Sequence, residues 1–265
     1  MTCHHASIFL NSHACRFPPL QKSNQPISMA KMNIPCGRAL LAILFMAKLM
    51  SITEANITTD EAALLQVKAH IALDPQNFFE RNWNLSATTN TSSSNSVCNW
   101  VGVTCGSRHG RVTDLSIPNL GLGGTIPPHV ANLSFLVSLN ISGNRFHGTL
   151  PNELWHMPRL RIIDLSSNRI SGNLFDDMCN SLTELESFDV SSNQITGQLP
   201  SSLGDCSKLK RLSVSFNELT GRIPQNIGNL TELMELYLNG NNLQGSVPPG
   251  LFHHSLLVAC LHRSL

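Results

Sequence analysis

Residues 136–151 read LVSLNISGNRFHGTLP, and this pattern returns along most of the chain. Its second glycine, Gly148, belongs to a series with steps of 24, 24, 25, 24 and 24 residues. A fixed period of this length predicts a solenoid, in which each repeat buries its apolar face only against its neighbours. The function of such a chain is expected on the surface that the stack presents. The series is Gly124, Gly148, Gly172, Gly197, Gly221 and Gly245.

Each repeat unit begins with an apolar residue, and further apolar residues follow three and five positions later. Their alternation predicts a short strand with one buried face. Eight positions into five of the units stands an asparagine, which we expect to bond the backbone of the next coil at a turn. Leu120 takes its place in the first unit. The units begin at Val112, Leu136, Leu160, Leu185, Leu209, Leu233 and Leu257.

The second half of each unit contains the recurring glycine and, in five of six units, a proline three residues later. Glycine permits a positive φ or a close backbone approach, and proline stops the extension of a strand ladder. The third unit has one extra residue and Phe175 in place of the proline, which we interpret as a tolerated loop insertion.

Together these positions spell L-x-x-L-x-L-x-x-N-x-L followed by L-x-G-x-I/L-P over residues 112–250. The pattern resembles the plant-specific leucine-rich repeat of receptor-like kinases and receptor-like proteins. The resemblance implies an α/β solenoid, a curved right-handed superhelix with parallel strands on its concave face. It places six repeats over residues 112–256 and a truncated seventh unit over 257–265, whose short apolar tail we expect to dock loosely.

Residues 56–111 are expected to cap the open end of this solenoid. Thr58 and Glu61 fit a capping box for a helix over residues 58–71, and Asp74-Pro75 ends it. Trp83 and Trp100 are expected to fill the core face. The strings DEAALLQVK and CNWVGVTC resemble the N-terminal cap of plant leucine-rich-repeat receptors, and the resemblance implies a disulfide between Cys98 and Cys105.

Residues 39–47, ALLAILFMA, follow two basic residues and precede small residues near Ala55, which is the pattern of a secretory signal. The run is shorter than the about 20 residues that span a bilayer, and a buried helix is the alternative. We expect a signal peptide over 29–55, an unstructured upstream segment over 1–28, and an extracellular or cell-surface location. In an exported chain the Cys98–Cys105 pair favours a disulfide over a metal site. Cys179 and Cys206 are interpreted as small buried apolar residues.

Six Asn-x-Ser/Thr sequons agree with export, and the one at Asn140 is the weakest because it lies on a predicted strand. The formal net charge is only +1, so neither nucleic acid nor acidic lipid is indicated as a partner. The sequons are Asn56, Asn84, Asn90, Asn132, Asn140 and Asn229.

No catalytic motif is found. The glycines around Gly123 lack the Lys-Ser/Thr of a phosphate loop, and the adjacent pair His253-His254 cannot face one metal from a helix. Asp176-Asp177 is more typical of a solvated turn. The sequence predicts no enzyme activity, no cofactor and no metal.

The outward-facing strand residues are the candidate ligand-binding surface, because residues that flank the buried strand positions must point away from the core. An ordinary solvated strand surface is the alternative for any one of them. Asp164, Asp189, Arg211 and Tyr237 are the strongest candidates. The full set is Asp114, Ser138, Asn140, Ile162, Asp164, Asp189, Arg211, Ser213, Glu235 and Tyr237.

The resemblance implies an extracellular recognition module of a receptor-like kinase in plant defence or development. Such a module binds a peptide or protein ligand on its concave face and pairs with a co-receptor ectodomain. It reaches the membrane only through a span outside this sequence. Two alternatives stay open: a soluble cell-wall protein, such as an inhibitor of a microbial polygalacturonase, and a non-functional truncated receptor fragment.

Overall fold

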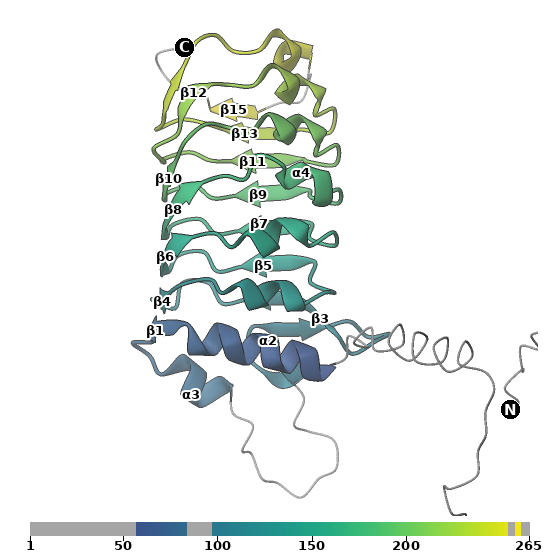
Figure 1. The fold of residues 1–265 in the computed structure, drawn as a ribbon, viewed down its shortest axis with the longest axis vertical. Helices are drawn as coiled ribbons and strands as arrows, with labels where there is room; N and C mark the ends of the chain where they lie inside the picture. Colours follow the sequence, from purple (N-terminus) through teal and green to yellow (C-terminus); the bar gives the residue numbers. More distant parts are fainter. Residues whose placement is uncertain (1–56, 84–96, 254–257, 261–265) are drawn as a thin grey trace, which may run out of the picture. The chain divides into compact units, whose positions relative to one another are not determined.

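The computed structural model describes residues 57–83, 97–253 and 258–260. The predicted signal peptide and upstream segment lie outside these residues, as do the sequons at Asn56, Asn84 and Asn90. Within them the repeats form successive coils that stack one on another, with the helix α2 (Ile57–Ala69) at the N-terminal end of the stack (Figure 1). We number the coils one to six from the starting residues Val112, Leu136, Leu160, Leu185, Leu209 and Leu233.

The first sheet takes one strand from each coil, in the order β15-β13-β11-β9-β7-β5-β3-β2. All neighbours are parallel except β2 and β3. In the strands of coils one to six the central residue, such as Leu139 or Phe188, is at most 1% exposed, as the alternation predicts, whereas Ala259 at the centre of β15 is exposed. The strands are β2 (Val103–Cys105), β3 (Val112–Ser116), β5 (Ser138–Asn140), β7 (Ile162–Asp164), β9 (Ser187–Asp189), β11 (Arg211–Ser213), β13 (Glu235–Tyr237) and β15 (Val258–Cys260).

A second sheet, absent from the sequence-based expectations, forms from the glycine-containing half of the units. It is built in the order β1-β4-β6-β8-β10, and a further pair joins β12 to β14. Each ladder ends before the proline, which has no N–H to donate. The strands are β1 (Ile71–Leu73), β4 (Gly123–Gly124), β6 (Arg145–Thr149), β8 (Arg169–Asn173), β10 (Gln194–Thr196), β12 (Thr220–Arg222) and β14 (Asn242–Gln244).

Short helices complete each coil on the remaining side. Five are 3₁₀ helices that follow or include the proline, and the third coil has the α-helical turn α4 (Met178–Ser181) instead. This turn accommodates the extra residue of the third unit, because both sheets keep their register across it. The insertion is therefore tolerated, as expected. The 3₁₀ helices are η2 (Pro128–Asn132), η3 (Asn152–His156), η4 (Ser201–Asp205), η5 (Gln225–Asn229) and η6 (Pro249–His253).

The recurring asparagine joins two coils at the turn between the sheets. Asn144 donates through Nδ2 to the carbonyl of Ile117 at 2.8 Å, and its Oδ1 accepts from the amides of Leu120 and Leu122 at 3.1 and 3.0 Å. These partners belong to the preceding coil, so the expectation of bonds to the next coil is wrong. The reason is directional. At this turn the backbone amides, such as that of Ile117, point toward the coil that follows, where the asparagine oxygen accepts those of Leu120 and Leu122.

The cap consists of α2, the short helix α3 (Phe78–Asn82) and the 3₁₀ turn η1 (Val97–Asn99). The predicted helix over 58–71 is found as α2, two residues shorter at its C-terminal end because β1 begins at Ile71. Asp74, expected only to end this helix, also accepts hydrogen bonds from the amides of Phe78 and Phe79 in α3. Trp83 and Trp100 stack with ring centroids 4.9 Å apart and are 1% and 6% exposed, which confirms them as core fillers.

Candidate ligand-binding surface

The outward-facing residues of the first sheet form two rows in register across six parallel strands. The predicted alignment is therefore confirmed, and the extra residue of the third unit does not disturb it. The first row is Asp114, Ser138, Ile162, Ser187, Arg211 and Glu235, and the second is Ser116, Asn140, Asp164, Asp189, Ser213 and Tyr237.

Exposure divides the candidate residues into two groups. Ile162 is 44% exposed, and most of the others are partly exposed. Asp189 and Ser213 are only 9% and 3% exposed, so these two side chains offer a ligand little surface. Ser213 lies in register between Asp189 and Tyr237, whose larger side chains flank it on both neighbouring strands.

Arg211 organises the C-terminal part of the surface. One guanidinium nitrogen, Nη2, lies 3.0 Å from Asp189 Oδ2, the other pairs with Glu235, and the guanidinium carbon lies 5.0 Å from the centroid of the Tyr237 ring. Burial works to lower the pKa of Arg211, but the hydrogen bonds to Asp189 and Glu235 outweigh it and raise this pKa above its ordinary value. We call these four residues the Arg211 cluster.

Three outward-facing side chains are also held by hydrogen bonds at the ends of their own strands. Oδ1 of Asn140, Asp164 or Asp189 accepts two hydrogen bonds from the serine two residues later, one from its amide and one from its hydroxyl. These bonds fix the side chains before any ligand arrives. Asp164 thus presents a carboxylate whose orientation is set by its own strand end.

Charges just before the strands are also paired between coils. Glu186 accepts from Lys210 at 3.1 Å and pairs with Arg161, while Lys208 lies 2.6 Å from Glu184. The hydrogen bond from Lys210, against some burial and with help from Arg161, holds the pKa of Glu186 below its usual value. Most charged side chains on and beside the strands of the first sheet are therefore paired with another side chain of the same molecule.

Matches to family models agree with this architecture. The leucine rich repeat N-terminal domain matches residues 57–106, and leucine rich repeat models match residues 135–157, 159–181 and 183–243. Together they cover more than half of the sequence. The chain belongs to the leucine-rich repeat family.

The relatives and structural neighbours of this leucine-rich repeat chain include plant receptor kinases. A probable LRR receptor-like serine/threonine-protein kinase of Arabidopsis thaliana is 44% identical over 88 residues, which are 33% of this chain and 8% of that relative. The chain thus spans under a tenth of the length of this curated relative.

Two solved ectodomains share the fold. The Arabidopsis HAESA ectodomain, in complex with an N-terminal extended IDA peptide hormone, matches with a TM-score of 0.67 and 27% identity over 79% of this chain and 33% of that one. The GASSHO1/SCHENGEN3 ectodomain from Arabidopsis thaliana, in complex with CASPARIAN STRIP INTEGRITY FACTOR 2, matches with a TM-score of 0.65 and 31% identity. The match covers 74% of this chain and 23% of that one.

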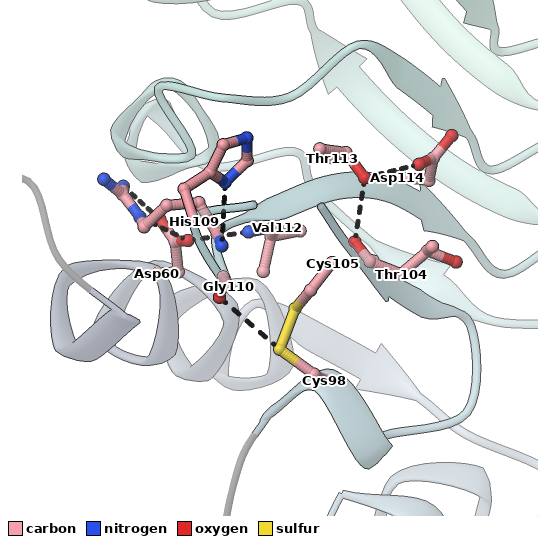
Figure 2. The surroundings of a disulfide bond; sticks show 10 residues. Asp60, Cys98, Thr104, Cys105, His109, Gly110, Val112, Thr113 and Asp114 are labelled. Carbon is pink, nitrogen blue, oxygen red and sulfur yellow. Dashed lines mark hydrogen bonds and ion pairs between the residues drawn. A yellow bond between two sulfur atoms is a disulfide. The ribbon is translucent and has the colours of Figure 1, made fainter. Parts of the chain in front are cut away.

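The cap of the leucine-rich repeat chain is closed by its own disulfide, and a buried ion pair with a hydrogen bond to Val112 ties its helix α2 to the start of the first coil. Cys98 and Cys105 form the expected disulfide, with Cα atoms 5.5 Å apart (Figure 2). Beside it, Asp60 of α2 accepts from Arg111 at 2.6 and 2.8 Å and from the amide of Val112 at 2.9 Å. Asp60 and Arg111 are 0% and 3% exposed, and sequence reasoning missed this pair because 51 residues separate its members.

Cys179 and Cys206 also form a disulfide, with Cα atoms 5.1 Å apart. Their burial was expected and is confirmed at 2% and 0% exposure, but their interpretation as unpaired apolar residues is wrong. The separation of 27 residues, close to one repeat, places them behind the sheets on adjacent coils. That spacing, in a chain whose sequence predicts export, could have indicated the bond.

Three further expectations concern the described residues. Asn132 and Asn229 are exposed at the ends of η2 and η5, whereas Asn140 is half-buried on β5. Within residues 57–83, 97–253 and 258–260, no three His, Cys, Asp or Glu side chains gather as a metal site would require. No helix in this part of the chain has the length and apolar character to cross a membrane.

Proposed function

We propose that residues 57–260 are an extracellular recognition module that binds a peptide or protein segment across the first sheet. The module would serve a plant cell-surface receptor kinase in defence or development signalling. The proposal includes passage through the secretory pathway with glycans on Asn132 and Asn229. A co-receptor ectodomain is proposed as a second partner.

The observation that carries this proposal is the Arg211 cluster on a sheet whose rows run in register. A charged and aromatic group held by neighbouring coils offers a ligand a surface that loses little side-chain entropy on binding. Tyrosine and arginine are the residue types that most often dominate binding energy at interfaces. Ile162, two coils away and 44% exposed, adds an apolar contact on the same face.

The solved neighbours support the same role. The HAESA ectodomain is in complex with a peptide hormone, and it shares the cap and repeat fold with this chain. A strip of six parallel strands about 4.8 Å apart is long enough for several residues of an extended peptide. The peptide that binds this strip is to be selected experimentally from a library.

The test uses the full secreted chain to select binders from a library of random peptides displayed on phage. Binding of the enriched synthetic peptides is then compared for R211A/Y237A and for H129A/R222A. The second variant also removes one arginine and one ring, but from exposed positions on η2 and β12. We expect at least tenfold weaker binding for the first variant only, with unchanged circular dichroism. Equal binding by both variants, or no enrichment above a blank surface, would overturn the proposal.

A further inference from the structure

The outward face of the second sheet differs chemically from the first sheet. Over β6, β8, β10, β12 and β14 its solvent-facing side chains are polar or cationic, and these strands contribute no acidic and no large apolar side chain to it. Most of these side chains are exposed, and the inward residues between them, such as Phe146 and Ile170, are buried. The polar uncharged members are Thr149, Ser171, Asn173, Gln194, Thr196, Thr220, Asn242 and Gln244.

Positive charge gathers in coils two and three of this face. Arg145 and His147 lie on β6 and Arg169 lies on β8, with His147 directly opposite Arg169 in the parallel register. All three are exposed, and adjacent strands lie about 4.8 Å apart. We call these three residues the cationic patch.

Neither arginine of the patch makes an ion pair with any residue that the structure describes, although Arg111, Arg161 and Arg211 all do. Glu218 is exposed on the same side but belongs to coil five, two coils beyond Arg169. Cationic side chains on facing strand positions repel one another when both are charged. The fold thus leaves positive charge that an external anion can neutralise.

We propose that the cationic patch binds a linear carboxylated polysaccharide, a polyuronate. The arginine guanidinium forms paired, charge-assisted hydrogen bonds with carboxylates. A uronate polymer carries one carboxylate on each sugar ring, so its charges are spaced along a line, as the cations are spaced over successive coils. Neighbouring hydroxyl and amide side chains, such as Thr149 and Asn173, can bond the sugar hydroxyls.

Two features favour a polysaccharide over a protein partner. Strands β6, β8, β10, β12 and β14 offer no exposed Phe, Tyr or Trp and no exposed large aliphatic side chain, which protein interfaces generally use. The exposed apolar side chain of this sheet is Leu73, on the edge strand β1. The hydroxyl and amide side chains of this face also recur on successive coils, from Thr149 to Gln244, where they can bond sugar hydroxyls along an extended chain. Such a polar surface suits a polysaccharide, and it is separate from the peptide site proposed on the first sheet.

The experiment measures binding of the full secreted chain to immobilised polygalacturonate over a series of salt concentrations. The test variant is R145A/R169A, and the control is R81A/R108A, which removes the same charge from exposed positions in the cap. Methyl-esterified polygalacturonate supplies the same sugar without its charge, and dextran sulfate supplies a different anion. Circular dichroism and the intact disulfides establish that every variant is folded.

We expect salt-sensitive binding to polygalacturonate, about tenfold weaker for R145A/R169A and unchanged within about twofold for R81A/R108A. The esterified polymer should not bind. The proposal is overturned if the wild-type protein does not bind polygalacturonate at low salt, or if both variants lose the same amount of binding affinity. Tighter arginine-dependent binding to dextran sulfate would also overturn it, because the patch would then select sulfate rather than carboxylate. Peptide selection on the first sheet is read separately, so either proposal can fail alone.

Discussion

The first and second sheets are built from the same coils, yet the arginines of the first are paired with acidic side chains, whereas those of the cationic patch on the second are not. On the first sheet Arg211 is held between Asp189 and Glu235, and Glu186 lies between Arg161 and Lys210. On the second sheet Arg145 and Arg169 have no ionic partner within the described residues. The repeat fixes the backbone of both faces but leaves their outward residues free, so one stack can carry two surfaces of different chemistry.

The turn between the sheets shows how closely the two faces are coupled. The residue before the recurring asparagine takes a positive φ in every coil, as at Ser192 (55°) or Gly143 (66°). In coil five it is Phe216, with a φ of 55° and 59% exposure. Its ring lies over Gly240 of the next coil, where a Cβ atom would come within 2.6 Å of it. A bulky residue in this conformation is strained.

The largest effect should come from the disulfide behind both sheets. Removing it with C179A/C206A frees a loop that spans a whole repeat and should lower the free energy of unfolding by about 3 kcal/mol. Urea denaturation of oxidised protein measures the loss, with untreated and reduced wild-type chain as references. If stability hardly changes, the coils are held by packing alone and the bond is incidental.

The next effect should come from the asparagine that joins the sheets. N217A leaves the amide of Ile195 and the carbonyl of Val190 without their side-chain partner and should cost about 2 kcal/mol. N242A, exposed on the neighbouring strand of the second sheet, is the matched control and should be neutral. Equal stability of the two variants would show that water replaces the lost bonds and that the sheets are not coupled at this turn.

Removing one arginine from each sheet tests the comparison most directly. R211A leaves Asp189 and Glu235, on the two strands that flank β11, without their shared cation. It should lower the free energy of unfolding by about 1 kcal/mol, and the loss should be largest at low salt. R145A removes no ion pair and should be neutral or slightly stabilising. The same urea titration measures both, and a loss for R145A equal to that for R211A would contradict the distinction between the two faces.

The smallest effect should be a gain at Phe216. Asparagine tolerates a left-handed backbone, so F216N relieves part of the penalty and should stabilise the chain by about 0.5 kcal/mol after the loss of ring packing. F216L keeps the strain and should give no gain. Thermal unfolding followed by circular dichroism compares the two, and a destabilised F216N would mean that packing on Gly240 outweighs the backbone cost.

The sequence by itself determined the backbone plan. The period located the strands of the first sheet but not those of the second, the alternation identified the buried leucines, and the third unit's extra residue was correctly interpreted as tolerated. These features depend on local patterns that repeat, so each unit supports the interpretation of the others. The Cys98–Cys105 bond was predicted differently, from the expected export of the chain and from the resemblance of its cap to that of plant leucine-rich-repeat receptors.

Only the tertiary structure decided which side chains meet. Asp60 forms an ion pair with Arg111, 51 residues away in the sequence, and Cys179 forms a disulfide with Cys206 on the next coil. Asp189 and Ser213 point outward by the strand rule, yet neighbouring coils cover them, while Arg145 and Arg169 remain open. A repeat pattern specifies where each side chain leaves the backbone. Burial and pairing depend on what the adjacent coils place beside it, and a sequence period does not contain that information.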